Sequence, residues 1–260
     1  MVVARRNYSE LAKQHIRKPG ARPLRALVYG RNKVGKTTFG ASAPKTLVID
    51  PEGGAEDLGP NIDLWPISRF PELDLVWRFL KESKHDYEYV CFDGLTRISN
   101  MGLRYVMKKG EERDLDRIPG MVQQRDYGKS GELMKGMLFN LHTLPIGIIY
   151  TAQERMESGA GFGDTEDDDA EDVDARFVPD LPRGVRSSVN AIVDVIGRLY
   201  TVKVEGTIKG KEVKGIQRRL WLSPSDVYDT GARSGKIRLP DYIKGPNVPK
   251  LIELLGKDQA

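Results

Sequence analysis

Eight residues near the start of the chain form a pattern that constrains the fold around them. They run from Gly30 to Thr37 and read Gly-Arg-Asn-Lys-Val-Gly-Lys-Thr, the spacing of a Walker A phosphate loop. Gly30 and Gly35 let the backbone curl so that its N–H groups face a phosphate. Lys36 places an ammonium beside the β- and γ-phosphates, and the Thr37 hydroxyl can bind Mg²⁺. The alternative is a glycine turn that carries a lysine by chance.

The loop lies between two stretches that are typical of buried strands. An apolar run at 26–29 precedes it, and a second one at 46–50 follows. Residues 38–43 would continue a helix whose positive end faces the phosphate. With this context the pattern predicts a nucleotide site. The residues expected to hold the nucleotide are Gly30, Arg31, Asn32, Lys33, Val34, Gly35, Lys36, Thr37 and Thr38.

Strand-like and helix-like patterns alternate along the rest of the chain. Further apolar runs at 87–92 and 146–150 are separated by stretches with helical periodicity. This alternation predicts an α/β fold, with a mostly parallel twisted central sheet and helices on both faces. Two later stretches, 196–204 and 213–222, predict a C-terminal β-hairpin.

We expect one domain, formed by residues 25–245. It would lie between a basic N-terminal arm, 1–24, and a C-terminal tail, 246–260. Residues 108–129 are polar and contain Pro and Gly, so they predict a long loop. Residues 156–186 have little apolar periodicity and predict a mobile acidic loop.

The charge of the chain is distributed unevenly. The chain has 41 Lys and Arg against 37 Asp and Glu, and eight of those acids lie within residues 164–174. Residues 1–25 carry seven Lys or Arg and the single acid Glu10. Basic surfaces favour a polyanion partner through phosphate contacts and counterion release. Solvation of exposed faces is an equally good explanation of charge alone.

Composition excludes several other classes of site and protein. Cys91 is the only cysteine, so one chain can form no disulfide, which fits a reducing cytoplasm. No apolar run approaches the ~18–20 residues of a membrane span, so no membrane partner is expected. The three histidines, His15, His85 and His142, are too far apart for a metal-spaced pair. The acidic run lacks the glycine and glutamate of a calcium-binding EF-hand loop.

Two carboxylates follow predicted strands and suit phosphoryl-transfer chemistry. Asp93 ends the run at 87–92 and predicts a Walker B ligand for Mg²⁺, bound directly or through a water. Glu52 follows the strand at 46–50 and predicts a general base near the attacking water. Because ligands collect at the carboxyl ends of parallel strands, we expect the loop, Glu52, Asp93 and Gln153 to meet there. A turn aspartate and a solvated glutamate are the alternatives.

These motifs together resemble the RecA-like P-loop ATPase core. The resemblance is carried by Gly30–Thr37, by Ile49-Asp50-Pro51-Glu52, by Cys91-Phe92-Asp93 and by Thr151-Ala152-Gln153, over roughly residues 24–245. The chain looks most like phage-encoded RecA-like ATP-binding proteins that act as single-strand annealing proteins or minimal recombinases. The resemblance implies that Glu52 activates water, and that Gln153 senses the γ-phosphate and couples it to a DNA-binding loop.

The resemblance also implies residues outside the nucleotide site. Basic residues of a neighbouring subunit complete the site in RecA-like filaments, and Arg233 and Lys236 occupy the corresponding segment; a solvated hairpin tip is the alternative. The loop after Gln153 corresponds to a DNA-binding loop, but the acids of 164–174 would repel phosphates. The run could be a gate, a partner-docking site or a mimic of nucleic acid. The flanking residues that would then hold DNA are Arg155, Arg176, Arg183 and Arg186.

The function expected from these observations is that of a Mg-ATP-dependent protein that binds single-stranded DNA. The catalytic residues would be Glu52, Lys36 and Gln153, with Thr37 and Asp93 on Mg²⁺, and hydrolysis would be stimulated by DNA. The protein would promote annealing or strand pairing in phage DNA recombination or replication, in the bacterial host cytoplasm. We expect a homo-oligomer, either ring or filament, with a single-strand-binding protein as a candidate partner.

Two alternatives use the same core. One is a DNA translocase, helicase or ATP-dependent nuclease. The other is a nucleotide-gated DNA-binding loader with little ATP turnover.

Overall fold

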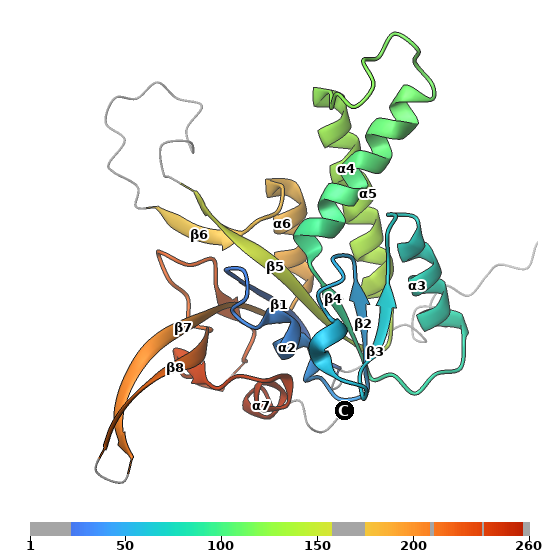
Figure 1. Ribbon diagram of the computed structural model, residues 1–260. Coiled ribbons are helices and arrows are strands. Elements are labelled where there is room, and N and C mark those ends of the chain that lie inside the picture. The colour runs from blue at the N-terminus through green and yellow to red at the C-terminus, as the bar shows by residue number, and fades with distance from the viewer. Residues whose placement is uncertain (1–21, 158–174, 209–210, 236, 257–260) are drawn as a thin grey trace, which may run out of the picture.

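The fold is built on one sheet in which a parallel centre is extended by antiparallel strands (Figure 1). The computed structural model describes residues 22–157, 175–208, 211–235 and 237–256. The order across the sheet is β10-β8-β7-β1-β5-β4-β2-β3. The strands are β1 (Arg25–Gly30), β2 (Thr46–Asp50), β3 (Asp63–Pro66), β4 (Tyr89–Asp93), β5 (Gly147–Glu157), β6 (Arg176–Pro179), β7 (Val195–Ile208), β8 (Lys211–Trp221), β9 (Gly231–Ala232) and β10 (Tyr242–Lys244).

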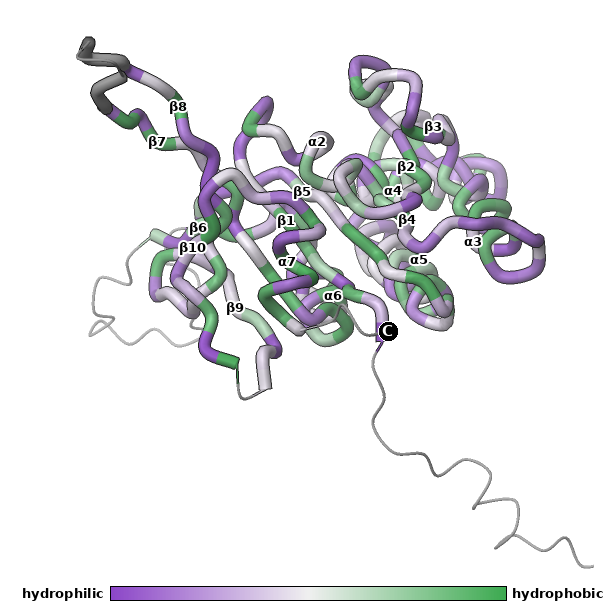
Figure 2. Tube along the Cα trace, turned by 90° about the horizontal axis from the view of Figure 1, so that it is seen from below, coloured by the Kyte–Doolittle hydropathy of each residue, from purple (hydrophilic) through white to green (hydrophobic). Residues whose placement is uncertain are grey.

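The pairing of the strands confirms the predicted fold class. β1 lies between β5 and β7 and is parallel to both, and β4 and β2 continue the parallel part. β7 and β8 form the predicted hairpin, pairing antiparallel from Arg198↔Trp221 to Ile208↔Lys211. Figures 1 and 2 show this hairpin extending away from the body of the molecule. The carboxyl ends of β1, β2, β4 and β5 share one edge, as a parallel sheet requires.

Helices cover both faces because alternate strand residues point to opposite sides. Leu27 and Tyr29 of β1 belong to the larger core cluster, whereas Ala26 and Val28 belong to the other. The larger cluster includes α3 (Glu72–Glu82), α4 (Leu95–Glu111), α5 (Gln124–His142) and α6 (Arg183–Ile192). The smaller cluster includes α2 (Lys36–Ala41) and α7 (Val248–Leu254). Among the described residues, none of the helices combines the length and apolar character needed to span a membrane.

Helices α4 and α5 extend beyond the sheet, and the connection between them is shorter than predicted (Figure 1). We expected a long loop at 108–129, but α4 continues to Glu111 and α5 begins at Gln124. The buried side chains of Arg117 and Asp126 form an ion pair, and Asp126 also accepts a bond from Gln123 N at 2.9 Å. These contacts order the start of α5, which the polar sequence did not indicate.

The expectation of a loop throughout 156–186 was wrong in part. Residues 158–174, which include the acidic run at 164–174, lie outside the described residues, as do 1–21 of the expected arm. Residues 176–179 form β6, which pairs antiparallel with the extended end of β5, and α6 begins at Arg183. The pairing of Glu154 with Pro179 and Glu157 with Arg176 is a long-range contact. Local periodicity carries no signal of such a contact.

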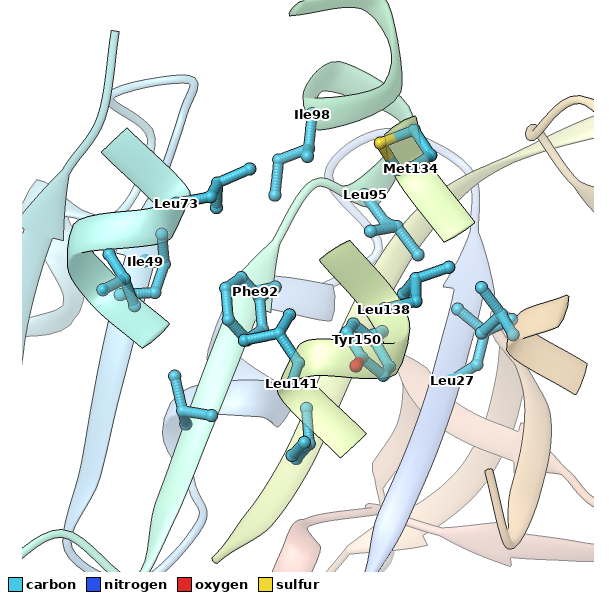
Figure 3. Packing of buried hydrophobic residues seen from close by; sticks show 14 of the residues in the cluster. Leu27, Ile49, Leu73, Phe92, Leu95, Ile98, Met134, Leu138, Leu141 and Tyr150 are labelled. Atoms are coloured by element: carbon cyan, nitrogen blue, oxygen red, sulfur yellow. The ribbon is translucent and has the colours of Figure 1, made fainter. Parts of the chain in front are cut away.

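The core between α5 and the sheet generates a stability prediction. Leu138 lies between α5 and the sheet with Phe92 and Tyr150 (Figure 3) and is 1% exposed, while its neighbour Phe139 is 58% exposed. We expect Leu138→Ala to lower the free energy of unfolding by about 2–5 kcal/mol, because it leaves a cavity. Phe139→Ala should change it by less than about 0.5 kcal/mol. Urea unfolding of both variants measures the difference, and equal losses would contradict this placement of α5.

Candidate nucleotide site

The loop between β1 and α2 has the tight backbone that its glycines predict. Gly35 has φ +100°, a conformation that L side chains rarely adopt, and its N–H precedes the first turn of α2. A Cβ on Gly30 would lie 2.2 Å from the carbonyl oxygen of Leu199 on β7. The loop therefore lies directly against β7, and only glycine fits at its first position.

The Lys36 side chain lies inside this loop. Its Nζ donates to Gly30 O at 2.9 Å, to Arg31 O at 2.7 Å and to Gln153 Oε1 at 3.1 Å. Burial lowers the pKa of Lys36, and the carboxylates of Asp93 and Glu52 act in the opposite direction. All three present acceptors are neutral, whereas a phosphate oxygen is an anionic and stronger acceptor. The donor set of the loop therefore fits a nucleotide phosphate.

A cavity of about 690 Å³ opens in front of the loop. Its volume is in the range of small-molecule and cofactor sites. Cations lie on the loop side of the cavity, and carboxylates come from the turn after β2 and from the end of β4. Its lining residues are Asn32, Lys33, Gly35, Lys36, Thr37, Thr38, Glu52, Gly54, Asp57, Leu58, Asp93, Gly94, Thr151, Gln153 and Arg218.

Asp93 is held at the end of β4 by its neighbour on β5. Thr151 Oγ1 donates to Asp93 Oδ1 at 2.7 Å and accepts from Gly94 N at 2.9 Å. Both Asp93 and Thr151 are buried. One carboxylate oxygen is thus fixed by a hydrogen bond, in a cavity that Thr37 also lines. A hydroxyl and one carboxylate are the few protein ligands that Mg²⁺ typically takes beside phosphate oxygens and waters.

Glu52 lies in a turn that Asp50 shapes. The Asp50 carboxylate accepts from Glu52 N at 2.9 Å, from Gly53 N at 2.8 Å and from Ala55 N at 2.9 Å. A Cβ on Gly94 would lie 3.2 Å from Glu52 Oε1, so Glu52 rests against the turn after β4. Burial raises the pKa of Glu52, and the nearby charge of Asp93 raises it further. A carboxylate with a raised pKa in a cleft is typical of a general base.

Gln153 connects the loop to the far side of β5. Its backbone N–H donates to Thr96 Oγ1 at 3.1 Å, and Thr96 Oγ1 donates to Asp180 O at 2.9 Å. Asp180 N in turn donates to Gln153 O at 2.8 Å. The backbone of Gln153, whose side chain bonds Lys36, is therefore fixed by α4 and by the segment after β6.

The predicted catalytic and metal-binding residues line one cavity, whereas the four arginines predicted to bind DNA lie elsewhere. Arg155 and Arg186 both form ion pairs with Glu157, and Arg186 also reaches Asp229 at 3.9 Å. Arg176 donates to Ser225 O at 3.5 Å, and Arg183 lies at the start of α6. None of these four arginines lines the nucleotide cavity.

The segment expected to act on a neighbouring subunit lies at the opposite edge of the sheet. Arg233 follows β9, which pairs with the first residues of β7, and its guanidinium donates to Ala191 O at 2.6 Å near the end of α6. It lines a separate cavity of about 630 Å³ that also contains Arg25 and His142. Lys236 lies outside the described residues.

Sequence reasoning assigned no role to several residues that line the cavity or, like Asp50, support its walls. Thr151 and Asp50 both lie within the quoted motifs, and an aspartate before Pro-Glu-Gly-Gly signals a side-chain-stabilised turn. Arg218 comes from β8, far along the chain, and carries no local signal of its place beside the loop.

Comparisons with known proteins assign the chain to a family. No curated protein matches the chain. Solved structures that match include the flagellar accessory protein FlaH of Methanocaldococcus jannaschii, with a TM-score of 0.40 and 12% identity, over 91% of this chain and 90% of that one. The sequence of residues 22–234 matches the AAA domain family. This match spans β1 to β9 and includes every residue of the nucleotide cavity, so the chain belongs to the AAA domain family and has a P-loop ATPase core.

Proposed function

We propose that the protein hydrolyses Mg-ATP and uses this reaction to act on single-stranded DNA. The observation that carries the hydrolysis is the single cavity that contains Lys36, Glu52, Asp93 and Gln153. An ammonium, a base, a metal ligand and an amide sensor are the groups that phosphoryl transfer to water requires. Glu52 follows β2, Asp93 is the last residue of β4, and Gln153 lies within β5.

Lys36 and Glu52 would perform complementary parts of the reaction. Lys36 already directs its N–H groups into the loop, so it would exchange carbonyl acceptors for phosphate oxygens and stabilise their negative charge. Glu52 would accept the proton of the attacking water. Its raised pKa makes it a better base than an ordinary glutamate, provided that it is ionised at the working pH.

Thr37 and Asp93 would hold Mg²⁺, and Thr151 would orient Asp93. When bound, Mg²⁺ neutralises charge on the phosphates. The Thr151 hydrogen bond leaves Asp93 Oδ1 in one position and the second carboxylate oxygen available for the metal or its water. Because Thr151 also accepts from Gly94 N, it fixes the turn that carries Asp93.

We propose that Gln153 links the state of the nucleotide to the DNA-binding segment. In the structure its side chain bonds Lys36, whose acceptors would change when a phosphate occupies the loop. β5 runs from Gln153 directly to Arg155 and Glu157, and Glu157 pairs with Arg186 of α6. DNA phosphates near this segment would compete with Glu157 for Arg155 and Arg186. We therefore expect these ion pairs to open when DNA binds.

The proposed work on DNA is annealing or strand pairing in phage recombination or replication. It is supported by the resemblance to RecA-like annealing proteins and by the basic excess outside residues 164–174. Assembly of a homo-oligomer would place Arg233 near the nucleotide of a neighbour. Its position at the edge of the sheet opposite its own loop is compatible with such a role.

The first prediction separates hydrolysis from DNA binding. Lys36→Ala and Glu52→Gln should each lower the rate of phosphate release at least about 100-fold, because they remove charge stabilisation and the base. Glu52→Gln should still bind ATP, since it keeps the loop. Phosphate release with and without single-stranded DNA, and annealing of complementary strands, measure these properties.

Several outcomes would contradict the proposal. Wild-type turnover that single-stranded DNA leaves unchanged would remove the proposed coupling. Directional unwinding would identify a helicase, and DNA degradation that survives Lys36→Ala would reveal a separate nuclease site.

A second prediction concerns pH. Because the folded pKa of Glu52 is raised above the ordinary glutamate value, the base gains a proton as the pH falls through that raised pKa. We expect the rate of hydrolysis to fall on the acidic side at a pH above the ordinary pKa range of glutamate. The residual rate of Glu52→Gln should not show this fall. A wild-type rate that stays constant down to pH 4.5 would show that Glu52 is not the base.

A third prediction tests the orientation of Asp93. Thr151→Val removes the hydroxyl that bonds both Asp93 and Gly94, so hydrolysis should require a several-fold higher Mg²⁺ concentration for half-maximal rate. Thr46→Val is a matched control, because Thr46 Oγ1 is buried without a hydrogen-bond partner among the described residues. A Mg²⁺ titration of the two variants that gave the same midpoint would contradict the role of Thr151.

A further inference from the structure

Arg218 lies over the phosphate loop of its own chain. A Cβ on Gly35 would lie 2.9 Å from both Cζ and Nε of Arg218, and 3.2 Å from its Nη1. The guanidinium therefore packs on the glycine that directly precedes Lys36. The positive φ of Gly35 favours glycine at this position, and the absence of a Cβ lets the Arg218 side chain approach the backbone.

The hairpin of β7 and β8 fixes the position of the Arg218 backbone. Arg218 of β8 pairs with Thr201 of β7, and its carbonyl oxygen accepts from Gly245 N at 2.9 Å. β7 in turn pairs with β1, the strand that leads into the loop. The backbone of Arg218 is thus anchored two strands away from the loop, while its side chain reaches across β7 to Gly35.

Within the described part of the chain, the donors of the Arg218 guanidinium are not taken up by a protein acceptor. Among the residues that the structure describes, its side chain makes no hydrogen bond and no ion pair, although it is an exposed cation beside Lys33. Arg218 lines the nucleotide cavity and also a larger one of about 1140 Å³ between the loop and the hairpin. The lining of the larger cavity contains five Lys or Arg and no carboxylate, and two of the five, Arg31 and Arg198, pair with Glu154 outside this lining. An anion is the ligand that these donors fit.

We propose that Arg218 binds the phosphate chain of the nucleotide held by its own subunit, as a further residue of the proposed ATPase site. Its planar fork can donate two N–H groups to one phosphate, from the side of the loop opposite Glu52 and Asp93. This inference rests on the proposed nucleotide function. It differs from the role expected for Arg233, because Arg218 acts within one chain and needs no neighbouring subunit.

The adjacent residue provides a matched control. Successive residues of a strand point to opposite faces, so Arg219 is directed away from the loop. Its Nε donates to Gln217 Oε1 at 2.9 Å, and its guanidinium lies 4.5 Å from the ring centroid of Tyr242. Replacing Arg219 removes the same charge from the same strand without touching the nucleotide cavity.

The experiment measures binding of a slowly hydrolysed fluorescent ATP analogue with Mg²⁺, by anisotropy. We expect Arg218→Ala to weaken binding about tenfold, which is the effect of losing one charge-assisted hydrogen bond, and Arg219→Ala to weaken it less than about twofold. Arg218→Lys, which keeps the charge but not the fork, should fall between wild type and Arg218→Ala. Circular dichroism and thermal unfolding confirm that each variant is folded.

The outcomes separate this inference from the proposed function. Wild-type affinity in Arg218→Ala, or equal losses in both alanine variants, would overturn the role of Arg218 while leaving the ATPase proposal intact. Failure of the wild type itself to bind the analogue would overturn both.

A mixing experiment tests whether the contact is made within one chain. Subunits with Arg218→Ala are combined with Lys36→Ala subunits, which keep Arg218 but lack the ammonium of the phosphate loop. At an ATP concentration low enough for the weaker binding of Arg218→Ala to limit the rate, we expect no recovery of ATP hydrolysis. Recovery would show that Arg218 serves a neighbouring subunit and would overturn the assignment.

Discussion

The hydrogen bonds of the Lys36 ammonium are the contacts on which the arrangement of the site depends. They join the end of β1, the phosphate loop and the middle of β5 around one cation. A buried cation is costly unless its donors are satisfied, so its acceptors must be in place before a ligand arrives. The parallel pairing of β1 with β5, which sets Gly30 opposite Gln153, provides two of those acceptors.

The same register brings the acidic side of the cavity into place. Asp93 pairs with Thr151 in the β4–β5 ladder, and Thr151 is two residues before Gln153. Because residues two apart on a strand face the same side, the partner of Asp93 and the partner of Lys36 both lie toward the cavity. One strand, β5, thereby sets the position of the metal ligand relative to the phosphate-binding lysine.

Residues that follow strand ends could be predicted from sequence, whereas residues that depend on long-range packing could not. Lys36, Glu52, Asp93 and Gln153 were predicted to meet because each follows an apolar run, and all four line one cavity. Arg218 lies beside them only because β8 folds back along β7, the strand that pairs with β1. The ion pair of Arg155 with Glu157 was not predicted, because Glu157 was expected to lie in a loop and β5 continues through it. The approach of Arg186 to Glu157 depends on β6 and α6. The pairing of β6 with β5 explains why the loop at 156–186 was predicted to be too long. At 108–129 the reason is different: α4 continues to Glu111, and the ion pair of Arg117 with Asp126 orders the start of α5.

The residue after Gln153 connects the cavity to the opposite face of the sheet. The Glu154 carboxylate forms ion pairs with Arg198 Nε at 2.9 Å and with Arg31 Nε at 3.1 Å. The Arg198 guanidinium lies 4.7 Å from the ring centroid of Phe177 and 4.5 Å from that of Tyr228. A twist of β5 that moved Gln153 would turn Glu154 as well, since the two share a peptide bond. Breaking the Lys36 contact would then alter how the Arg198 guanidinium packs on the rings of Phe177 and Tyr228. A rotation of β5 at this point would therefore move the Gln153 amide on one face of the sheet and the Glu154 carboxylate on the other.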